Sequence, residues 1–194
     1  MYRSATAYRL DDIARIRNGY VPRQLVADPF GGYRALQLRD LAAEGGFDWS
    51  RLLSPRIETD AERHVVRDGD VVVNLRGALR AWRISNPPDR VVVLGQLAVV
   101  TPAAGSLDPD YLCWRLNHPD THAALRAFVK GTRLAFVSMA DLRRLEIELP
   151  PWPTQRSIGR AAALARHEQR LQHQLSAARR TLVDLHLLRA ARAH

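Results

Sequence analysis

Apolar and polar positions follow two different patterns on either side of the prolines at 150, 151 and 153. Before these prolines, short apolar runs are separated by Gly, Asn and Pro, whereas after them apolar residues recur at steps of three and four. The first pattern is typical of short strands mixed with helices, and the second of one long amphipathic helix. We therefore expect an α+β (mixed α/β) domain over residues 1–150 and a helical segment over residues 151–194.

Three segments of the expected domain carry the strand pattern. Residues 8–16 alternate enough to indicate a strand that enters a helical turn. Residues 65–75 place Gly69 between two β-branched runs, which predicts a hairpin, and residues 91–100 resemble a buried strand interrupted at Gly95. The first half of the domain should therefore be rich in short strands.

The later part of the domain changes to a helical period. Asp108 is an N-cap residue for a helix that Pro119 should stop, and Gly131 can close a second short helix. Ser138 begins a capping-box pattern for one more helical turn, ahead of an alternating strand over 145–149. Strands and helices are thus interspersed along the chain.

The segment after the prolines carries a heptad pattern of nearly four repeats, which favours a coiled coil over an isolated helix. The expected dimerisation seam is formed by Ala161, Leu164, Glu168, Leu171, Leu175, Ala178, Leu182 and Leu185. A helix of this length reaches about 55 Å, and its leucines would form an exposed apolar patch without a partner helix. We expect a homodimer in which Glu168 meets an arginine of the opposing helix. The alternative is packing against the helix's own domain, for which Val183, Leu187 and Leu188 leave room.

The charge of the chain adds a candidate partner to this picture. Of 194 residues, 29 are Lys or Arg and 20 are Asp or Glu, which gives a formal net charge of +9. Residues 154–194 hold eight basic and two acidic side chains, so the excess lies largely on the helix. Such a surface favours a polyanion because it displaces counterions from phosphates. We find no membrane-length apolar run and no signal peptide, and we expect a cytoplasmic protein without a membrane partner.

Motifs that would indicate catalysis are weak. Asn86-Pro87-Pro88 resembles the catalytic motif of adenine methyltransferases, but Asp89 stands where that motif has an aromatic residue. No glycine-rich cofactor loop precedes it, so a turn is favoured. The only lysine, Lys130, excludes an Asp/Glu-x-Lys nuclease signature, because a phenylalanine stands two residues before it. We therefore expect no enzyme.

Metal-ligating and nucleophilic side chains are equally sparse. His118, Asp120 and His122 could cluster around a metal ion, but Pro119 breaks the regular geometry and no further ligand pattern supports a site. Cys113 is the only cysteine, which fits a reducing compartment, and its apolar surroundings favour a buried core residue. We expect neither a metal nor a cofactor to bind this chain by itself.

Three segments, taken in order, resemble the specificity subunits of type I restriction-modification systems. They are YRLDDIARIRNGYVPR at 8–23, VVRDGDVVVNLRGALR at 65–80 and KGTRLAFVSMADLRRLEIELPPWPTQRSI at 130–158. The last resembles the family most, with its Gly-Thr, apolar-Ser turn, Leu-rich strand, proline pair and Gln-basic-x-Ile helix start. A leucine heptad follows, as in that family.

The resemblance implies a target-recognition domain at 1–150 and a conserved helical spacer at 151–194. Full members of the family carry two of each, and their spacers pair antiparallel, so this chain resembles a half-length form that dimerises, a fragment or a relic. The implied partners are double-stranded DNA, DNA adenine methyltransferase (modification) subunits, which use S-adenosylmethionine, and a restriction subunit. An identical pair of readers would recognise a bipartite palindrome. The competing hypothesis is a coiled-coil scaffold or oligomerisation adaptor without specific DNA reading.

Base reading requires side chains that present paired donors or acceptors, chiefly Arg, Asn and Gln. Loops anchored on a scaffold are where such groups concentrate, and an adjacent glycine permits close approach to a phosphate. The candidate DNA-binding residues are Arg17, Asn18, Tyr20, Arg23, Arg34, Gln37, Arg76, Arg80, Lys130 and Arg133. For each of them, the alternative is a solvated charge or a surface ion pair.

Overall fold

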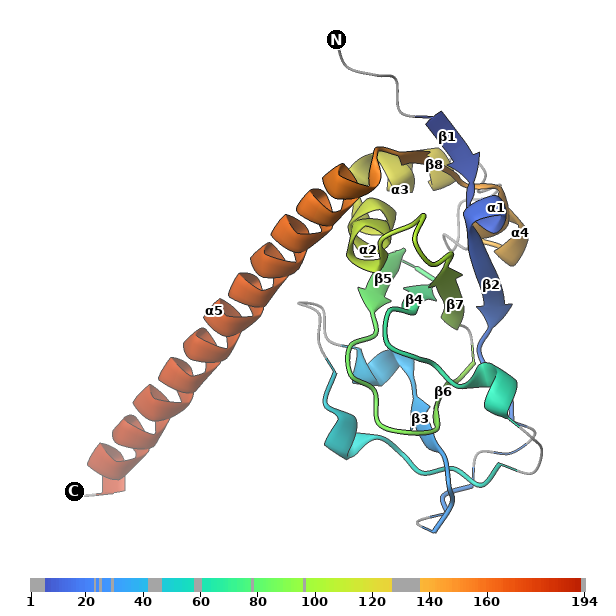
Figure 1. The fold of residues 1–194 in the computed structure, drawn as a ribbon. Coiled ribbons are helices and arrows are strands. Elements are labelled where there is room, and N and C mark those ends of the chain that lie inside the picture. Colours follow the sequence, from blue (N-terminus) through green and yellow to red (C-terminus); the bar gives the residue numbers. More distant parts are fainter. Residues whose placement is uncertain are drawn as a thin grey trace.

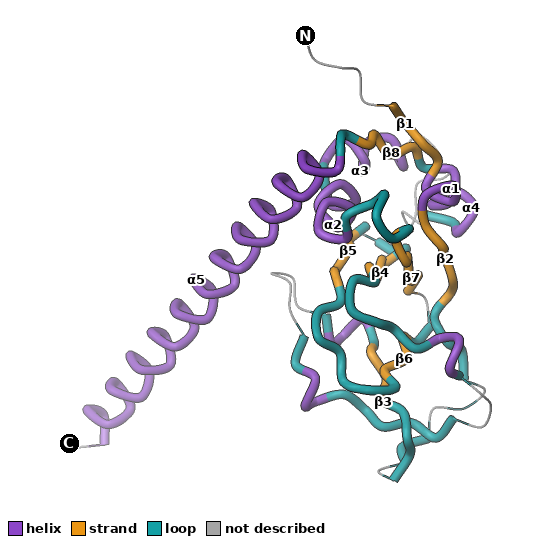
Figure 2. Tube along the Cα trace, viewed as in Figure 1, coloured by secondary structure: helices purple, strands orange, loops and turns teal. Residues whose placement is uncertain are grey.

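The computed structural model describes residues 6–192 apart from 23, 25, 29, 42–46, 58–60, 78, 96 and 127–136. An α+β domain is followed by one long helix that leaves it at one end (Figures 1 and 2). This arrangement confirms the predicted fold class. The strands are β1 (Thr6–Arg9), β2 (Ala14–Asn18), β3 (Arg34–Leu36), β4 (Val71–Asn74), β5 (Arg80–Arg83), β6 (Val91–Val93), β7 (Leu97–Pro102) and β8 (Glu146–Leu149).

The described part of the chain also contains five α-helices, of which four follow β7 in sequence. They are α1 (Leu10–Ile13), α2 (Pro109–Asn117), α3 (Pro119–Arg126), α4 (Met139–Arg144) and α5 (Trp152–Arg192), with 3₁₀ turns at Leu38–Asp40, Trp49–Arg51 and Glu62–His64. None of the helices in the described part of the chain is long and apolar enough to cross a membrane.

A four-stranded antiparallel sheet in the order β2-β7-β4-β5 organises the domain. Consecutive residues are buried along all of β4 and most of β7, which shows that both faces of the sheet are covered. One face packs with α1, α2 and α4, and the other, which carries Trp82 of β5, packs against β3, β6 and Trp49. The sheet therefore lies in the middle of the domain.

Two smaller pairings complete the fold. β1 pairs antiparallel with β8, so the start of the described chain is joined to the strand that directly precedes α5. β3 pairs in parallel with β6. The predicted strand over 8–16 is thus two strands separated by α1, and the interrupted strand over 91–100 is β6 and β7 with Gly95 between them at a φ of +71°.

The hairpin predicted over 65–75 is wrong. A turn does form there, and Gly69 has a φ of +86°. However, Val65 bridges to Val92 and the Val66 amide donates to Val91, whereas β4 pairs with β5 and β7. The turn at Gly69 therefore forms as expected, but the two apolar runs beside it pair with other strands.

The predicted helix caps of the domain are confirmed where the structure describes them. The Asp108 carboxylate accepts a hydrogen bond from the Tyr111 amide at 2.9 Å, ahead of α2. Ser138 and Asp141 form a reciprocal capping box at the start of α4. The proposed cap at Gly131 lies outside the described residues.

The C-terminal helix α5 begins at Trp152, so Pro153 lies in its first turn, where the missing amide proton is not needed. The predicted seam is exposed along its length, and the exposed fractions of Leu164 and Leu182 are 61% and 67%. Only the first part of α5 packs against the domain, chiefly against α2, where Gln155 and Gly159 are buried. The alternative in which the leucines fold back on their own domain is therefore not what this chain adopts.

Candidate nucleic-acid interface

Loops that carry four of the predicted DNA-binding residues leave the central sheet at the same end. In the β2–β7 pairing, Asn18 lies opposite Ala98, and in the neighbouring pairings Asn74 lies opposite both Leu97 and Arg80. The end of β2, the start of β7, the end of β4 and the start of β5 therefore coincide. We call the loops after β2 (residues 18–22) and between β4 and β5 (residues 75–79), with their flanking residues, the loop end of the sheet.

Gly19 shapes the first of these loops. Its amide donates to the Leu97 carbonyl at 2.8 Å, and a Cβ atom at this position would lie 2.9 Å from the Val93 carbonyl oxygen. The chain can pass between β6 and β7 only because no side chain is present. The next residue, Tyr20, donates its amide to Val93 and places its ring edge against His64, with ring centroids 5.5 Å apart. Tyr20 is thereby held in a defined orientation, two residues after Asn18.

The loop between β4 and β5 is held by Asn74. Its side-chain amide donates to the Arg76 carbonyl at 2.7 Å, and its side-chain oxygen accepts from the Arg76 amide at 3.1 Å. Gly77 follows at a φ of +70°, a left-handed conformation that glycine adopts without steric cost. Arg76 and Arg80 are exposed on either side of this turn. Two exposed arginines thus flank the turn at Gly77.

Arg17 differs from its neighbours because its guanidinium is engaged within the fold. It donates to the Thr101 hydroxyl at 2.8 Å and to the Val65 carbonyl at 2.9 Å, and it forms an ion pair with Asp70 at 3.0 Å. The Thr101 hydroxyl in turn donates to Asp70 at 2.6 Å. With a side chain 15% exposed, Arg17 joins β2 to the segments before β4 and at the end of β7.

Arg34 and Gln37 belong to the segment around β3. Arg34 is exposed and donates its amide to the Arg90 carbonyl, and the Arg90 guanidinium lies over the Tyr33 ring, 5.7 Å from its centroid. Gln37 instead caps the 3₁₀ turn at Leu38–Asp40. Its backbone amide donates to the Asp40 carboxylate, and its side chain accepts from the Asp40 backbone amide. The remaining predicted residues, Arg23, Lys130 and Arg133, lie outside the described residues.

A groove of about 580 Å³ runs beside β2, and four arginines line it together with Glu62, Asp68 and Asp70. Arg15 and Arg17 share one face of β2, as the two-residue period of a strand requires, and this signal was available in the sequence. Arg63 and Arg67 join them from the segment before β4. Their approach depends on tertiary structure, because about 50 residues separate them from β2 along the chain.

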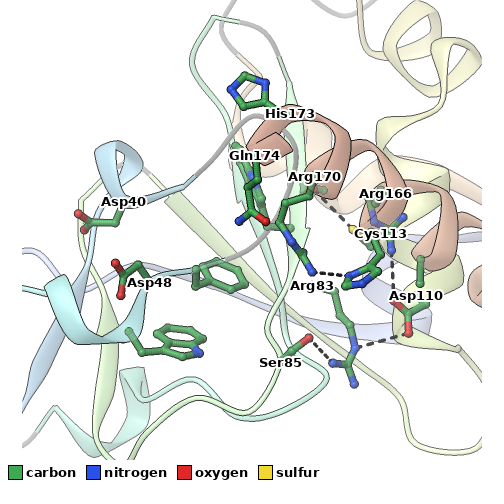
Figure 3. A pocket seen from close by; sticks show the side chains of 16 residues that line it. Asp40, Asp48, Arg83, Ser85, Asp110, Cys113, Arg166, Arg170, His173 and Gln174 are labelled. Carbon is green, nitrogen blue, oxygen red and sulfur yellow. Dashed lines mark hydrogen bonds and ion pairs between the residues drawn. The ribbon is translucent and has the colours of Figure 1, made fainter. Parts of the chain in front are cut away.

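A second groove, of about 740 Å³, lies between α5 and the domain (Figure 3). Its helical wall is largely basic and its opposite wall carries acidic side chains and a stacked pair of aromatic rings, Phe47 and Trp49. The helix contributes Arg166, His167, Arg170 and His173, and the domain contributes Asp40, Asp48, Arg83 and Asp110.

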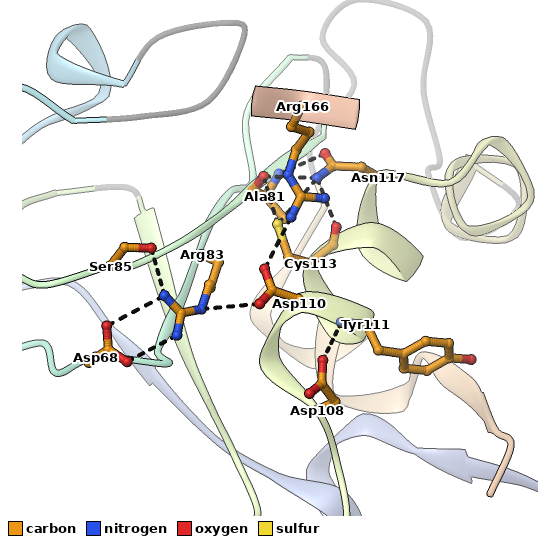
Figure 4. A network of polar contacts seen from close by, with 10 residues as sticks. All are labelled: Asp68, Ala81, Arg83, Ser85, Asp108, Asp110, Tyr111, Cys113, Asn117 and Arg166. Atoms are coloured by element: carbon orange, nitrogen blue, oxygen red, sulfur yellow. Dashed lines mark hydrogen bonds and ion pairs between the residues drawn. The ribbon is translucent and has the colours of Figure 1, made fainter. Parts of the chain in front are cut away.

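Asp110 joins the two walls of this groove. Its carboxylate lies 3.2 Å from Arg166 of α5 and 3.6 Å from Arg83 of β5, and Arg83 reaches Asp68 at 3.0 Å (Figure 4). Burial raises the pKa of Asp110, although both arginines favour its charged form. This network was not predicted, because its members come from four separate segments.

His118, Asp120, His122 and Cys113, which were weighed as metal ligands or as a nucleophile, all contact other groups within the domain. His118 Nδ1 lies 3.4 Å from the Asp120 carboxylate, and the His122 ring contacts the Leu116 carbonyl at 3.1 Å. Among the residues with described positions, no three His, Cys, Asp or Glu side chains form a cluster that could hold a metal ion. Cys113 is 1% exposed, and burial raises the pKa of its thiol, so it is a core residue as expected.

Comparison with known proteins identifies the fold but not a close relative. No protein-family model and no curated protein matches this chain. A solved HsdS subunit from Thermoanaerobacter tengcongensis is 19% identical with a TM-score of 0.59, and the match covers 87% of this chain and 39% of that chain. A type I restriction-modification system S subunit from M. genitalium is 18% identical with a TM-score of 0.54, over 88% of this chain and 41% of that chain.

A third match comes from a structure that describes complex assembly and conformational transition of the type I R-M system, at 21% identity and a TM-score of 0.59. It covers 93% of this chain and 41% of that chain. The chain thus spans about two-fifths of the length of these structures, and because the matches cover 87–93% of this chain, they include the domain and at least part of the helix. The resemblance seen in the sequence is confirmed at the level of structure, and the chain has the fold of type I restriction-modification S subunits.

Proposed function

We propose that this chain recognises a DNA sequence as a specificity subunit of a type I restriction-modification system. The observation that carries the proposal is the match of the domain and helix together to S subunits, over 87–93% of the chain. The loop end of the sheet supports it, because Asn18, Arg76 and Arg80 carry the donors and acceptors that read or bind DNA. The chain positions catalytic partners and has no catalytic role of its own.

The exposed seam of α5 supports a homodimer. The domain packs against the side of the helix that carries Gln155, Gly159 and Arg166, and the seam begins at Ala161 on another side. With 3.5 residues per turn, Gly159 and Arg166 occupy the heptad position directly opposite the a and d positions. The leucines are therefore free to pair with a second copy while the domain stays in place.

The order of residues in the seam favours antiparallel pairing. When two copies pair around position 173, Ala161 faces Leu185, Leu164 faces Leu182, Glu168 faces Ala178 and Leu171 faces Leu175. In this register, each alanine of the seam faces a larger residue, and Glu168 does not face a second glutamate. Arg179 of the second copy lies beside Glu168 and can neutralise its charge. In a parallel pair, Glu168 would face itself, and like charges in a desolvated seam are unfavourable.

Antiparallel pairing predicts a bipartite DNA site. Gly159, where α5 crosses α2, lies 14 residues from position 173, so the two crossing points are held about 42 Å apart along the coil. This separation exceeds one turn of DNA, about 34–36 Å. Two identical domains related by a twofold axis would read an inverted repeat separated by unread base pairs. Modification subunits, which methylate adenine, and a restriction subunit are the proposed protein partners.

Binding to random duplex DNA over a range of salt concentrations tests the proposal. A DNA-recognition subunit binds with an affinity that falls steeply and linearly on a log–log plot, because bound phosphates release counterions. Sequencing the duplexes enriched from a random library should return an inverted repeat with a gap. A weak, flat salt response and no enriched sequence would favour the coiled-coil adaptor instead.

A further inference from the structure

The start of α5 is joined to the domain by one buried side chain, Gln155, which is 2% exposed. Its side-chain oxygen accepts from the Asp108 amide at 3.0 Å. Its side-chain nitrogen donates to the Ser106 carbonyl at 3.1 Å and to the Pro150 carbonyl at 2.9 Å. A single amide therefore satisfies backbone groups both ahead of α2 and after β8, and it ties the first turn of the helix to both segments.

One turn further on, Gly159 sets how closely α5 approaches α2. A Cβ atom at this position would lie 2.6 Å from the Asp108 carboxylate and 2.7 Å from the Tyr111 amide nitrogen. These two atoms are themselves hydrogen-bonded as the N-terminal cap of α2, so neither can move away without breaking that cap. The two helices can cross at this distance only with glycine, a residue that helix interiors otherwise disfavour.

Two turns beyond Gly159, Arg166 makes the third contact. It binds Asp110, the same carboxylate that Arg83 approaches from β5 (Figure 4). Contacts at residues 155, 159 and 166 lie on one side of the helix and extend over three turns. Three contacts spaced along an axis fix its direction as well as its position. From Leu171 onward, the described part of the helix is almost entirely exposed.

We propose that Gln155 and Gly159 are positioning residues that fix the direction of α5 relative to the recognition domain, and thereby set the spacing of the two DNA half-sites. The proposal rests on the proposed function. Its physical basis is leverage, because position 173, the centre of the proposed pair, lies 14 residues, or about 21 Å, beyond Gly159. A tilt of about 10° at this joint would move each domain by about 4 Å relative to that centre, and the two domains together by about 7 Å, about the rise of two base pairs at about 3.4 Å each.

A distance measurement within one chain tests the joint without DNA. Spin labels are attached to cysteines introduced at two exposed positions, Asp89→Cys in the domain and Ser176→Cys on the helix, and buried Cys113 is left in place. Labelled protein is diluted with unlabelled protein so that only distances within a chain are measured. We expect one narrow distance distribution with Gly159, and a broadened or shifted one in Gly159→Ala.

Matched variants separate the joint from general effects on the helix. Gln155→Glu is nearly isosteric but brings a carboxylate oxygen against two carbonyls, and it should also broaden the distribution. Ser157→Ala lies between the two positions and is exposed, so it should leave the distribution unchanged. Circular dichroism establishes that each variant is folded, and if Gly159→Ala unfolds, Gln155→Glu decides. Wild-type distributions in the folded variants would overturn the proposed joint.

Selection from a random duplex library then tests the effect on DNA. The proposal predicts one gap length among duplexes enriched by the wild-type protein, and several or shifted gap lengths with Gln155→Glu or Gly159→Ala. If the distances broaden but the gap length stays the same, the joint does not set the spacing and this proposal is wrong. If the wild-type protein enriches no duplex, the proposed function fails, whereas the spin-label distances still judge the joint on their own.

Discussion

At the scale of single residues, Asp70 is the group on which the stability of the β2 region depends most directly. It is buried, and it pairs with Arg17 at 3.0 Å and accepts from Thr101 at 2.6 Å. Asp70→Ala would leave the Arg17 guanidinium largely buried without its counter-ion, which costs about 3 kcal/mol or more. We expect urea denaturation to show a loss of that size in the free energy of unfolding.

A matched control for this loss is Asp89→Ala, which removes an exposed carboxylate from the turn before β6. Exposed charges contribute about 0–1 kcal/mol, so the stability of this variant should stay close to that of the wild type. Equal losses in the two variants would mean that the Arg17 pair contributes no more than a surface charge.

The buried carboxylate of Asp110 should make the stability of the protein depend on pH. Burial raises its pKa in the folded protein, so folding disfavours the charged form of this group. The stability that it contributes is therefore fully present below the ordinary carboxyl value, about 4, and is lost as the pH rises through the raised value. Measured by urea denaturation, the stability of the wild type relative to Asp110→Asn should fall between pH 4 and neutral pH. A relative stability that rises over this range would show that the two arginines outweigh burial.

Residue roles could be predicted from the sequence only where the partners are local. The caps at Asp108 and Ser138 act on residues three positions away, and both were found. The roles of Arg17 and Gln155 depend on partners 84 and 49 residues away, and no local pattern indicates them. Gly159 carried a usable signal, since a glycine inside a long helix usually marks a close approach.

At the scale of elements, the seam of α5 makes the dimer testable by one substitution. Leu171 faces Leu175 next to the centre of the proposed antiparallel pair, so Leu171→Asp introduces two charges into the coil. Losing two buried leucines costs about 3 kcal/mol or more, which corresponds to a rise of at least about 100-fold in the dimer dissociation constant. Analytical ultracentrifugation over a concentration series measures this constant.

Leu187→Asp provides the matched control. Leu187 is as exposed in the single chain as the seam leucines, but its heptad position lies opposite the seam. The same chemical change there should leave the dissociation constant within a few-fold of the wild-type value. A wild-type sample with the mass of one chain at high concentration would contradict the paired seam altogether.

Element prediction succeeded for α5 and failed for the hairpin, and the two outcomes have different physical origins. A helix satisfies its backbone hydrogen bonds internally, so its period can be read from the sequence alone. A strand needs a partner, and the run before Gly69 pairs with β6 while the run after it pairs with β5 and β7. The local turn was visible, but the choice among apolar partners is made by the whole fold.

At the scale of the whole molecule, the domain and helix form one unit that presents two surfaces. The loop end of the sheet carries candidate DNA contacts, and the exposed side of α5 carries the seam. The change from β8 to α5 falls at the prolines, where the sequence pattern also changes. The angle between the two parts was not predictable, because Gln155, Gly159 and the Arg166–Asp110 pair set it through contacts across the chain.

The link between pairing and DNA binding yields the last prediction. If the two domains of a dimer bind one duplex, binding of the second domain is intramolecular. Loss of the dimer should then lower the affinity for DNA by about 10²–10⁴-fold, although no DNA-contacting residue changes. A single domain also neutralises half as many phosphates, so the slope of log affinity against log salt should be halved. Fluorescence anisotropy with the enriched duplex should show both effects in Leu171→Asp and neither in Leu187→Asp. A reduced affinity with an unchanged slope would mean that the single chain contacts as many phosphates as the dimer, and it would contradict the binding of one duplex by two domains.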